Sequence, residues 1–217
     1  MRIKICGVKT LEDSLIACGA RADMLGFNFY APSPRYIEQT ACRKIITEIK
    51  AVFSQVVCVG VFVNHSATQI ETIMDFIGLD LAQLSGDEPP ETLTALGKRA
   101  FKALRPQDPA ELNELIAALP SRQNAPAFLL DSHHKGSFGG SGQTGDWELA
   151  ARIAKSYPIL LAGGLNPDNV AEAIRVVQPW GVDVASGVES QRGVKDSQRI
   201  VNFIQQARVA AQEIITP

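Results

Sequence analysis

The chain has 217 residues, of which 46% are hydrophobic and 20% charged, with a formal net charge of -2 and a pI near 5.9. This charge leaves no basic stripe for a nucleic-acid backbone, and 6% aromatic residues offer few platforms for base stacking. No apolar stretch approaches the roughly 20 residues that cross a bilayer, and no signal-peptide pattern precedes the first predicted strand. We therefore expect a cytoplasmic protein that binds neither nucleic acid nor membrane, and whose partner is a small molecule.

Short β-rich runs alternate with amphipathic helical patterns along the whole chain. The predicted strands cover 2–6, 23–29, 55–63, 80–84, 100–104, 127–131, 158–162 and 181–185. The predicted helices cover 10–19, 38–50, 66–77, 88–98, 108–119, 146–156, 167–177 and 196–213. Several helices open with cap signals, which are Thr10-x-x-Asp13, Ser66, Asp108-Pro109 and Asn166-Pro167.

Strict alternation of strand and helix requires a parallel sheet, and eight such units close into a barrel. An open, doubly wound sheet is the structural alternative, but no G-x-G-x-x-G follows the first strand. No linker or composition shift divides the chain. We therefore predict the α/β class, as a single-domain (β/α)8 TIM barrel of eight parallel strands over residues 1–217.

The first predicted strand ends in Lys4-Ile5-Cys6-Gly7, which places a lone thiol just before a glycine turn. Alternation along the strand puts Cys6 on the same face as Lys4, opposite Ile3 and Ile5. In a barrel, Lys4 then points to the interior, where an unpaired ammonium is costly. Strand eight neighbours strand one in a closed barrel, so we expect a Lys4–Asp183 ion pair; a direct role of Lys4 with substrate is the alternative.

The loops after the strands build the active face of such barrels, so polar residues at strand ends are candidates for function. Asp131 ends the sixth strand and is expected to face the same mouth as Cys6, and a carboxyl and a thiol across a barrel mouth suggest acid–base proton transfer. A covalent nucleophile or an inert core thiol are the alternatives for Cys6, but none of the three histidines falls at a strand end to serve as its base. The remaining polar groups at strand ends are Asn28 with Arg35, Asn64, Gln83 with Ser85-Gly86-Asp87, Arg105, Gly163-Gly164 and Ser186-Gly187.

A thiolate with a protonated carboxyl lies roughly 6 kcal/mol above a thiol with a carboxylate, from reference pKa values of about 8.5 and 3.9. The site or the substrate has to remove much of this difference. We expect the N-terminus of the adjacent helix to lower the pKa of Cys6.

Glycine turns follow the last two predicted strands, at Gly163-Gly164 and at Ser186-Gly187, the second ahead of a possible short helical turn. Turns at these two positions commonly hold phosphate in this fold through backbone N–H groups. The alternative for a single turn is that glycine only supplies a positive φ, but two turns on adjacent strands favour a phosphorylated substrate.

Residues 132–145 form a glycine-rich segment whose length is typical of a lid or a binding loop. It contains His133-His134, which are adjacent in sequence and have no acidic cluster beside them. A metal site is therefore disfavoured, and we expect exposed loop histidines. The four cysteines, at 6, 18, 42 and 58, form no C-x-x-C pair, which fits a reducing compartment.

Together these motifs resemble the phosphoribosylanthranilate isomerase family of tryptophan biosynthesis over nearly the whole chain. The motifs that carry the resemblance are Lys4-Ile5-Cys6-Gly7, Pro34-Arg35-Tyr36, Gly60-Val61-Phe62-Val63-Asn64, Gln83-Leu84-x-Gly86-Asp87-Glu88, Leu130-Asp131, Gly139-Gly140-Ser141-Gly142, Asp146-Trp147, Ala162-Gly163-Gly164-Leu165-Asn166-Pro167-x-Asn169-Val170 and Val182-Asp183-x-Ala185-Ser186-Gly187-Val188-Glu189.

The resemblance implies an Amadori rearrangement of N-(5-phosphoribosyl)anthranilate, with no cofactor and no metal. It implies that Asp131 protonates the ring oxygen and that Cys6 removes the C2 proton. Arg35 would hold the anthranilate carboxylate, although the motif alone also allows a solvated loop charge. The backbone of Gly163, Gly164, Ser186 and Gly187 would hold the phosphate.

One position departs from the family, since Ser85 stands where a histidine is usual. We do not expect the chemistry to depend on this residue; its effect would fall on substrate affinity or on the local pKa balance. The nearest rival function is an isomerase of the histidine pathway, or one that acts on both substrates, but those enzymes use two aspartates. A sugar-phosphate-binding barrel without catalysis is the rival from another class. The sequence allows a monomer or a homodimer.

Overall fold

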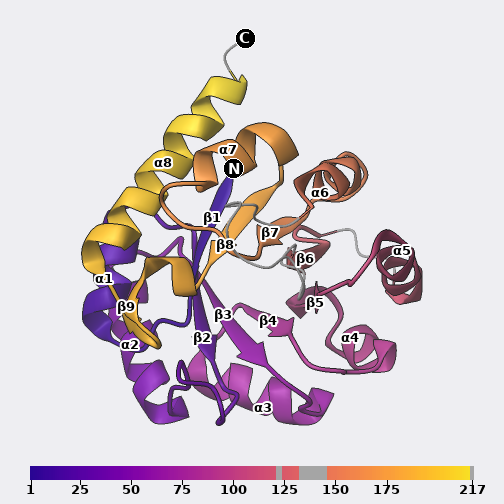
Figure 1. The fold of residues 1–217 in the computed structure, drawn as a ribbon. Coiled ribbons are helices and arrows are strands. Elements are labelled where there is room, and N and C mark those ends of the chain that lie inside the picture. Colours follow the sequence, from indigo (N-terminus) through magenta and orange to yellow (C-terminus); the bar gives the residue numbers. More distant parts are fainter. Residues whose placement is uncertain (121–123, 132–145, 216–217) are drawn as a thin grey trace.

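The computed structural model describes residues 1–120, 124–131 and 146–215. Within these residues, eight parallel strands form a closed barrel in chain order from β1 to β8, and helices surround it (Figure 1). The strands are β1 (Arg2–Cys6), β2 (Met24–Asn28), β3 (Val57–Phe62), β4 (Leu81–Leu84), β5 (Ala100–Leu104), β6 (Phe128–Asp131), β7 (Leu160–Ala162) and β8 (Gly181–Val184). The predicted (β/α)8 barrel is confirmed.

Each strand is followed by a helix that packs outside the barrel. The helices are α1 (Leu11–Gly19), α2 (Gln39–Val52), α3 (Ala67–Ile77), α4 (Pro90–Leu96), α5 (Pro109–Ala118), α6 (Trp147–Ala154), α7 (Val170–Val177) and α8 (Ser197–Ile215). A 3-10 turn, η1 (Gly97–Arg99), separates α4 from β5. Helix α8, yellow in Figure 1, packs against both α7 and α1 and so closes the outer ring.

The alternation in β1 produces the two sides of the barrel wall. Ile3 and Ile5 are fully buried in the larger apolar cluster, which also holds the barrel-facing side chains of the helices. Lys4 points the other way and is paired in register with Asp183 of β8. A smaller cluster of Met24, Val59, Phe101, Ala103, Leu129, Leu160 and Ala162 fills the interior.

Three of the four predicted cap signals begin helices as expected. The Thr10 hydroxyl accepts the N–H of Asp13 at 3.1 Å, and the Ser66 side chain forms a capping box with Gln69. Asp108 accepts two N–H groups in the first turn of α5.

The cap predicted at Asn166-Pro167 is wrong, because α7 begins only at Val170. The Asn166 side chain instead accepts the N–H of Asp168 at 2.8 Å, and the Asn169 side chain accepts the N–H of Asn166 at 2.8 Å. These bonds hold a separate turn ahead of the helix.

Two small elements follow β8. The expected helical turn is present as η2 (Ser186–Val188), and it leads into an antiparallel hairpin of β9 (Glu189–Gln191) and β10 (Val194–Lys195). The sequence did not predict this hairpin.

The predicted lid at 132–145, with His133 and His134, lies outside the described residues. No helix among the residues that the structure describes is long and apolar enough to span a membrane. The four cysteines are free thiols and all are buried.

Candidate active site

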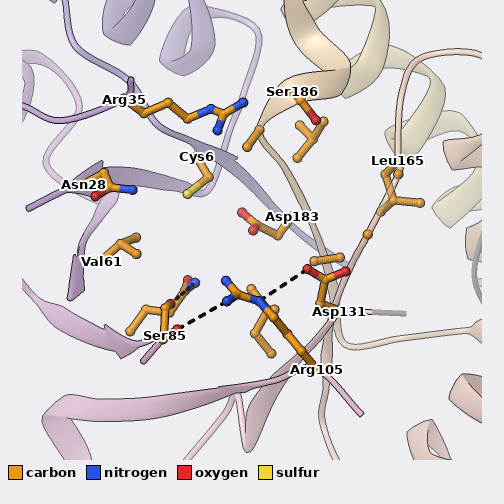
Figure 2. Close-up of a pocket in the computed structure, with 17 residues that line it drawn as sticks. Cys6, Asn28, Arg35, Val61, Ser85, Arg105, Asp131, Leu165, Asp183 and Ser186 are labelled. Carbon is orange, nitrogen blue, oxygen red and sulfur yellow. Dashed lines mark hydrogen bonds and ion pairs between the residues drawn. The ribbon is translucent and has the colours of Figure 1, made fainter. Parts of the chain in front are cut away.

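A cavity of about 520 Å³ opens at the carboxyl ends of the strands (Figure 2). Six of the seven predicted site residues line it, and they come from positions as far apart as β1 and the turn after β8. These six are Cys6, Arg35, Asp131, Gly163, Gly164 and Ser186. The barrel closure therefore gathers groups that the sequence separates by up to 180 positions.

Cys6 ends β1 and presents its sulfur to this cavity, with only 8% of the residue exposed (Figure 2). The pKa of the thiol is raised because burial disfavours the thiolate, while the charges of Lys4 and Lys195 act to lower it. The net pKa of Cys6 is thus raised and not lowered, because burial at the strand end outweighs the cations.

The predicted ion pair between Lys4 and Asp183 is confirmed. The fully buried Lys4 ammonium donates to Asp183 Oδ1 at 2.9 Å and to Gln83 Oε1 at 3.0 Å. The Gln83 amide in turn donates to the Ser85 hydroxyl at 3.1 Å. Ser85 thus ends a buried chain of hydrogen bonds and also lines the cavity.

Asp131 ends β6 and faces the cavity on the side away from Arg35 (Figure 2). Its side chain is 29% exposed, and one carboxylate oxygen lies 3.7 Å from Arg105 Nε. Arg105 also donates to the Ser85 carbonyl at 3.3 Å. Its position after β5 marked it as a candidate in the sequence, but nothing there indicated its contact with Asp131.

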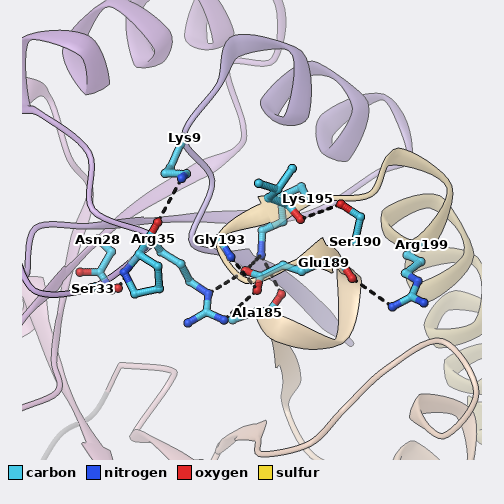
Figure 3. A network of polar contacts seen from close by, with 12 residues as sticks. Lys9, Asn28, Ser33, Arg35, Ala185, Glu189, Ser190, Gly193, Lys195 and Arg199 are labelled. Atoms are coloured by element: carbon cyan, nitrogen blue, oxygen red, sulfur yellow. Dashed lines mark hydrogen bonds and ion pairs between the residues drawn. The ribbon is translucent and has the colours of Figure 1, made fainter.

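Arg35 is not a solvated loop charge, because it forms an ion pair with Glu189 of the hairpin (Figure 3). Its Nε and Nη2 donate to the two Glu189 oxygens at 2.6 and 2.8 Å, and this hydrogen bonding raises the pKa of the guanidinium. Glu189 also accepts from Lys195 Nζ at 3.2 Å and from the Gly193 N–H at 3.1 Å.

Glu189 and Lys195 are functional candidates that sequence reasoning missed. Arg35 and Glu189 lie 154 positions apart, and no local periodicity relates two residues at that distance. The available signal was the cluster of charged residues after the eighth strand, close to a predicted phosphate turn.

The glycine turns after β7 and β8 border the cavity. Gly163 and Gly164 have φ values of 98° and 67°, so the turn requires glycine and at the same time lies open to the cavity. Gly187 is the exception, because it is not among the lining residues. Its α-carbon packs on the Leu165 carbonyl, where a β-carbon would lie 1.9 Å from the oxygen.

No group of three or more His, Cys, Asp or Glu side chains that could hold a metal ion occurs within the described ranges.

The polar cavity occupies the position at which (β/α)8 barrels bind their substrates, so the fold and the site define a member of the TIM-barrel enzymes. The profile of a family described as N-(5'phosphoribosyl)anthranilate (PRA) isomerase matches residues 3–206. The N-(5'-phosphoribosyl)anthranilate isomerase of Roseiflexus sp. is 45% identical over 217 residues, covering 98% of this chain and 100% of the relative. This chain belongs to the N-(5'-phosphoribosyl)anthranilate isomerase family.

Solved structures agree with this assignment. The phosphoribosyl anthranilate isomerase of Thermotoga maritima superposes with a TM-score of 0.84 at 36% identity, covering 96% of this chain and 99% of that one. A phosphoribosyl anthranilate isomerase solved in complex with reduced 1-(o-carboxyphenylamino)-1-deoxyribulose 5-phosphate gives 0.82 at 34% identity, with the same coverage.

Proposed function

We propose that this protein converts N-(5-phosphoribosyl)anthranilate into 1-(2-carboxyphenylamino)-1-deoxyribulose 5-phosphate. The observation that carries the proposal is that Cys6 and Asp131 border the same cavity as the glycine turns. Family membership and the ligand of the solved relative indicate which phosphorylated sugar would fill it.

In the proposed reaction, Asp131 donates a proton to the ribose ring oxygen, and the C1–O bond breaks to leave an iminium ion. The Cys6 thiolate then removes the proton from C2, and the electron pair of that C–H bond forms an enamine. Tautomerisation of the enol at C2 gives the ketone of the product. General acid and general base steps of this kind contribute about 10²–10⁴ each to the rate.

Arg35 is proposed to bind the anthranilate carboxylate. A guanidinium has five N–H donors, and the contact with Glu189 uses one on Nε and one on Nη2. The rest are available to a substrate in the cavity that Arg35 lines. Glu189 therefore fixes the plane of the guanidinium without using all its donors.

The phosphate is proposed to lie against the backbone N–H groups of Gly163, Gly164, Ser186 and Gly187. Three of these residues line the cavity, and the two turns meet where Gly187 packs on the Leu165 carbonyl. Gly187 is proposed to contribute through its N–H, since its α-carbon faces the Leu165 carbonyl.

Several broader expectations belong to the same proposal: a single domain over 1–217, a monomer or a homodimer, and a cytoplasmic location. Four free buried thiols support the last of these, because disulfides are rare in reducing compartments. Sedimentation analysis would decide between one and two subunits.

The test follows the loss of phosphoribosylanthranilate fluorescence with purified protein. We expect turnover in the native enzyme, and a loss of about 10²-fold or more in Cys6→Ala and in Asp131→Asn with the circular dichroism spectrum unchanged. Cys18→Ala, which removes a buried thiol from α1, is the matched control and should keep its activity. Absence of turnover in the native protein would instead favour a binding barrel, and near-normal rates in either site variant would falsify the role assigned to that residue.

A further inference from the structure

We propose that Lys4 is a positioning residue for Cys6: its ammonium holds the Cys6 thiolate in place. Lys4 does this in addition to forming the structural ion pair with Asp183. The proposal deepens the proposed function, because it rests on Cys6 acting as the base. It assigns a role to a fully buried cation that the mechanism above does not use.

The geometry starts at Gly26 of β2, which is paired in register with Cys6. The position that a β-carbon on Gly26 would occupy lies 2.8 Å from Cys6 Sγ and 3.1 Å from Lys4 Nζ. The thiol and the ammonium therefore lie beside the same small space, and a side chain at position 26 would crowd both of them. Glycine at this position lets them approach each other.

The donors of the Lys4 ammonium support the same conclusion. An ammonium has three N–H donors, and two of them bind Asp183 and Gln83. The third is left for the thiol, and a hydrogen bond from Lys4 acts with its charge to stabilise the thiolate of Cys6. A buried ammonium makes charge-assisted hydrogen bonds, which are the strong ones.

The charged side chains around Cys6 have a net charge of +1, which a single negative charge would neutralise. Lys4, Lys195 and Arg35 are cations that interact with the thiolate, Asp183 opposes it, and Glu189 binds both Arg35 and Lys195. Three cations therefore face two carboxylates, so a thiolate makes this group of side chains neutral. Among the cations, Lys4 has the largest effect on the pKa of the thiol.

The test measures the rate at which iodoacetamide, an uncharged reagent, alkylates Cys6 as a function of pH, with peptide mass mapping to separate Cys6 from the other three thiols. Because only the thiolate reacts, the rate reports its population. The comparison is between Asp183→Asn and Lys4→Met/Asp183→Asn, which have the same neutral residue at 183 and differ in the ammonium alone. We expect the double variant to react about tenfold more slowly at pH 7.5, which corresponds to one unit of pKa.

A second variant, Gly26→Ala, keeps every charge and places a methyl group against both the thiol and the ammonium, so that one of them has to move. It should also slow alkylation at pH 7.5, and it decides the question if the double variant does not fold. The proposal would be overturned if the alkylation rates of the folded proteins agreed within threefold, either between Asp183→Asn and the double variant or between the native protein and Gly26→Ala. If alkylation slows as expected while Cys6→Ala keeps full turnover, the role of Lys4 stands and the assignment of Cys6 as the base is wrong.

Discussion

At Gly187 the neighbouring backbone leaves no space for a side chain. A β-carbon there would overlap the Leu165 carbonyl oxygen at 1.9 Å, and that carbonyl belongs to backbone that cannot rotate away. The glycine therefore sets how closely the turns after β7 and β8 approach each other. This spacing is what a phosphate held between the two turns would depend on.

Gly187→Ala should consequently push these turns apart. We expect KM for phosphoribosylanthranilate to rise by about tenfold, or about 1.4 kcal/mol of binding free energy. Gly19→Ala is the control, because a β-carbon there meets nothing within 4 Å beyond its chain neighbours and the backbone of its own helix. Steady-state kinetics would check this, and an unchanged KM in Gly187→Ala would show that the spacing of the turns does not govern binding.

The β9–β10 hairpin is a small element that contains a buried network of charged side chains. It has five residues in its two strands, yet Glu189 at its start connects Arg35 from the loop after β2 with Lys195 at its end (Figure 3). The side chains of Glu189 and Lys195 are only 4% and 2% exposed, so each charge depends on its partner. The hairpin therefore couples its own folding to the position of a proposed substrate-binding arginine.

Glu189→Ala should be strongly destabilising, because it leaves two cations without their carboxylate. We expect the free energy of unfolding to fall by about 3 kcal/mol in urea titrations. Asp75→Ala removes an ion pair with Arg99 in which the Asp75 side chain is 67% exposed, and it should cost less than about 1 kcal/mol. Equal effects of the two substitutions would contradict the view that the hairpin depends on buried charge.

Glu88 connects the loops after β3 and β4. Its carboxylate accepts the N–H groups of Asn64 and Gly86 and pairs with Lys102 at 2.5 Å. Burial raises the pKa of Glu88, but the hydrogen bonds from Lys102 and the backbone outweigh it, so the net pKa lies below its ordinary value. The stabilisation is then complete above the unfolded-state pKa of about 4.3 and is lost as pH falls through the lower folded-state pKa.

Glu88→Gln should therefore be less stable than the native protein at pH 7. The difference in the free energy of unfolding should narrow as pH falls below about 4.3, because both proteins then have a neutral side chain at this position. Urea unfolding across pH 3 to 7 measures it. A difference that stays constant over this range would mean that the charge of Glu88 contributes nothing.

At the scale of the whole molecule, the sequence predicted the barrel because each strand is short, apolar and followed by an amphipathic helix. It also predicted that Lys4 and Asp183 meet, since β1 and β8 are neighbours in any closed barrel of eight strands. The predicted cavity residues Cys6 and Asp131 follow from the same rule, because strand ends share one face.

What the sequence could not predict depends on long-range pairing or on local competition between side chains. The contact of Arg35 with Glu189 joins two loops with no periodic relation, and strands of two or three residues such as β9 and β10 give no alternation to detect. The predicted start of α7 was wrong because the Asn169 side chain accepts the N–H of Asn166, and the Asn166 side chain accepts the N–H of Asp168, in a turn before the helix begins. The pKa of Cys6 depends on enclosure at the strand end, which composition does not report.

The central claim is that Cys6 and Asp131 act on one sugar whose phosphate lies in the glycine turns. A crystal structure of this protein with reduced 1-(o-carboxyphenylamino)-1-deoxyribulose 5-phosphate tests it most directly. The account predicts the phosphate against the N–H groups of Gly163, Gly164 and Ser186, with the Cys6 sulfur next to C2 and the Asp131 carboxyl on the opposite side of the ribulose chain. A ligand whose phosphate lies elsewhere, or whose C2 is out of reach of the sulfur, would contradict it.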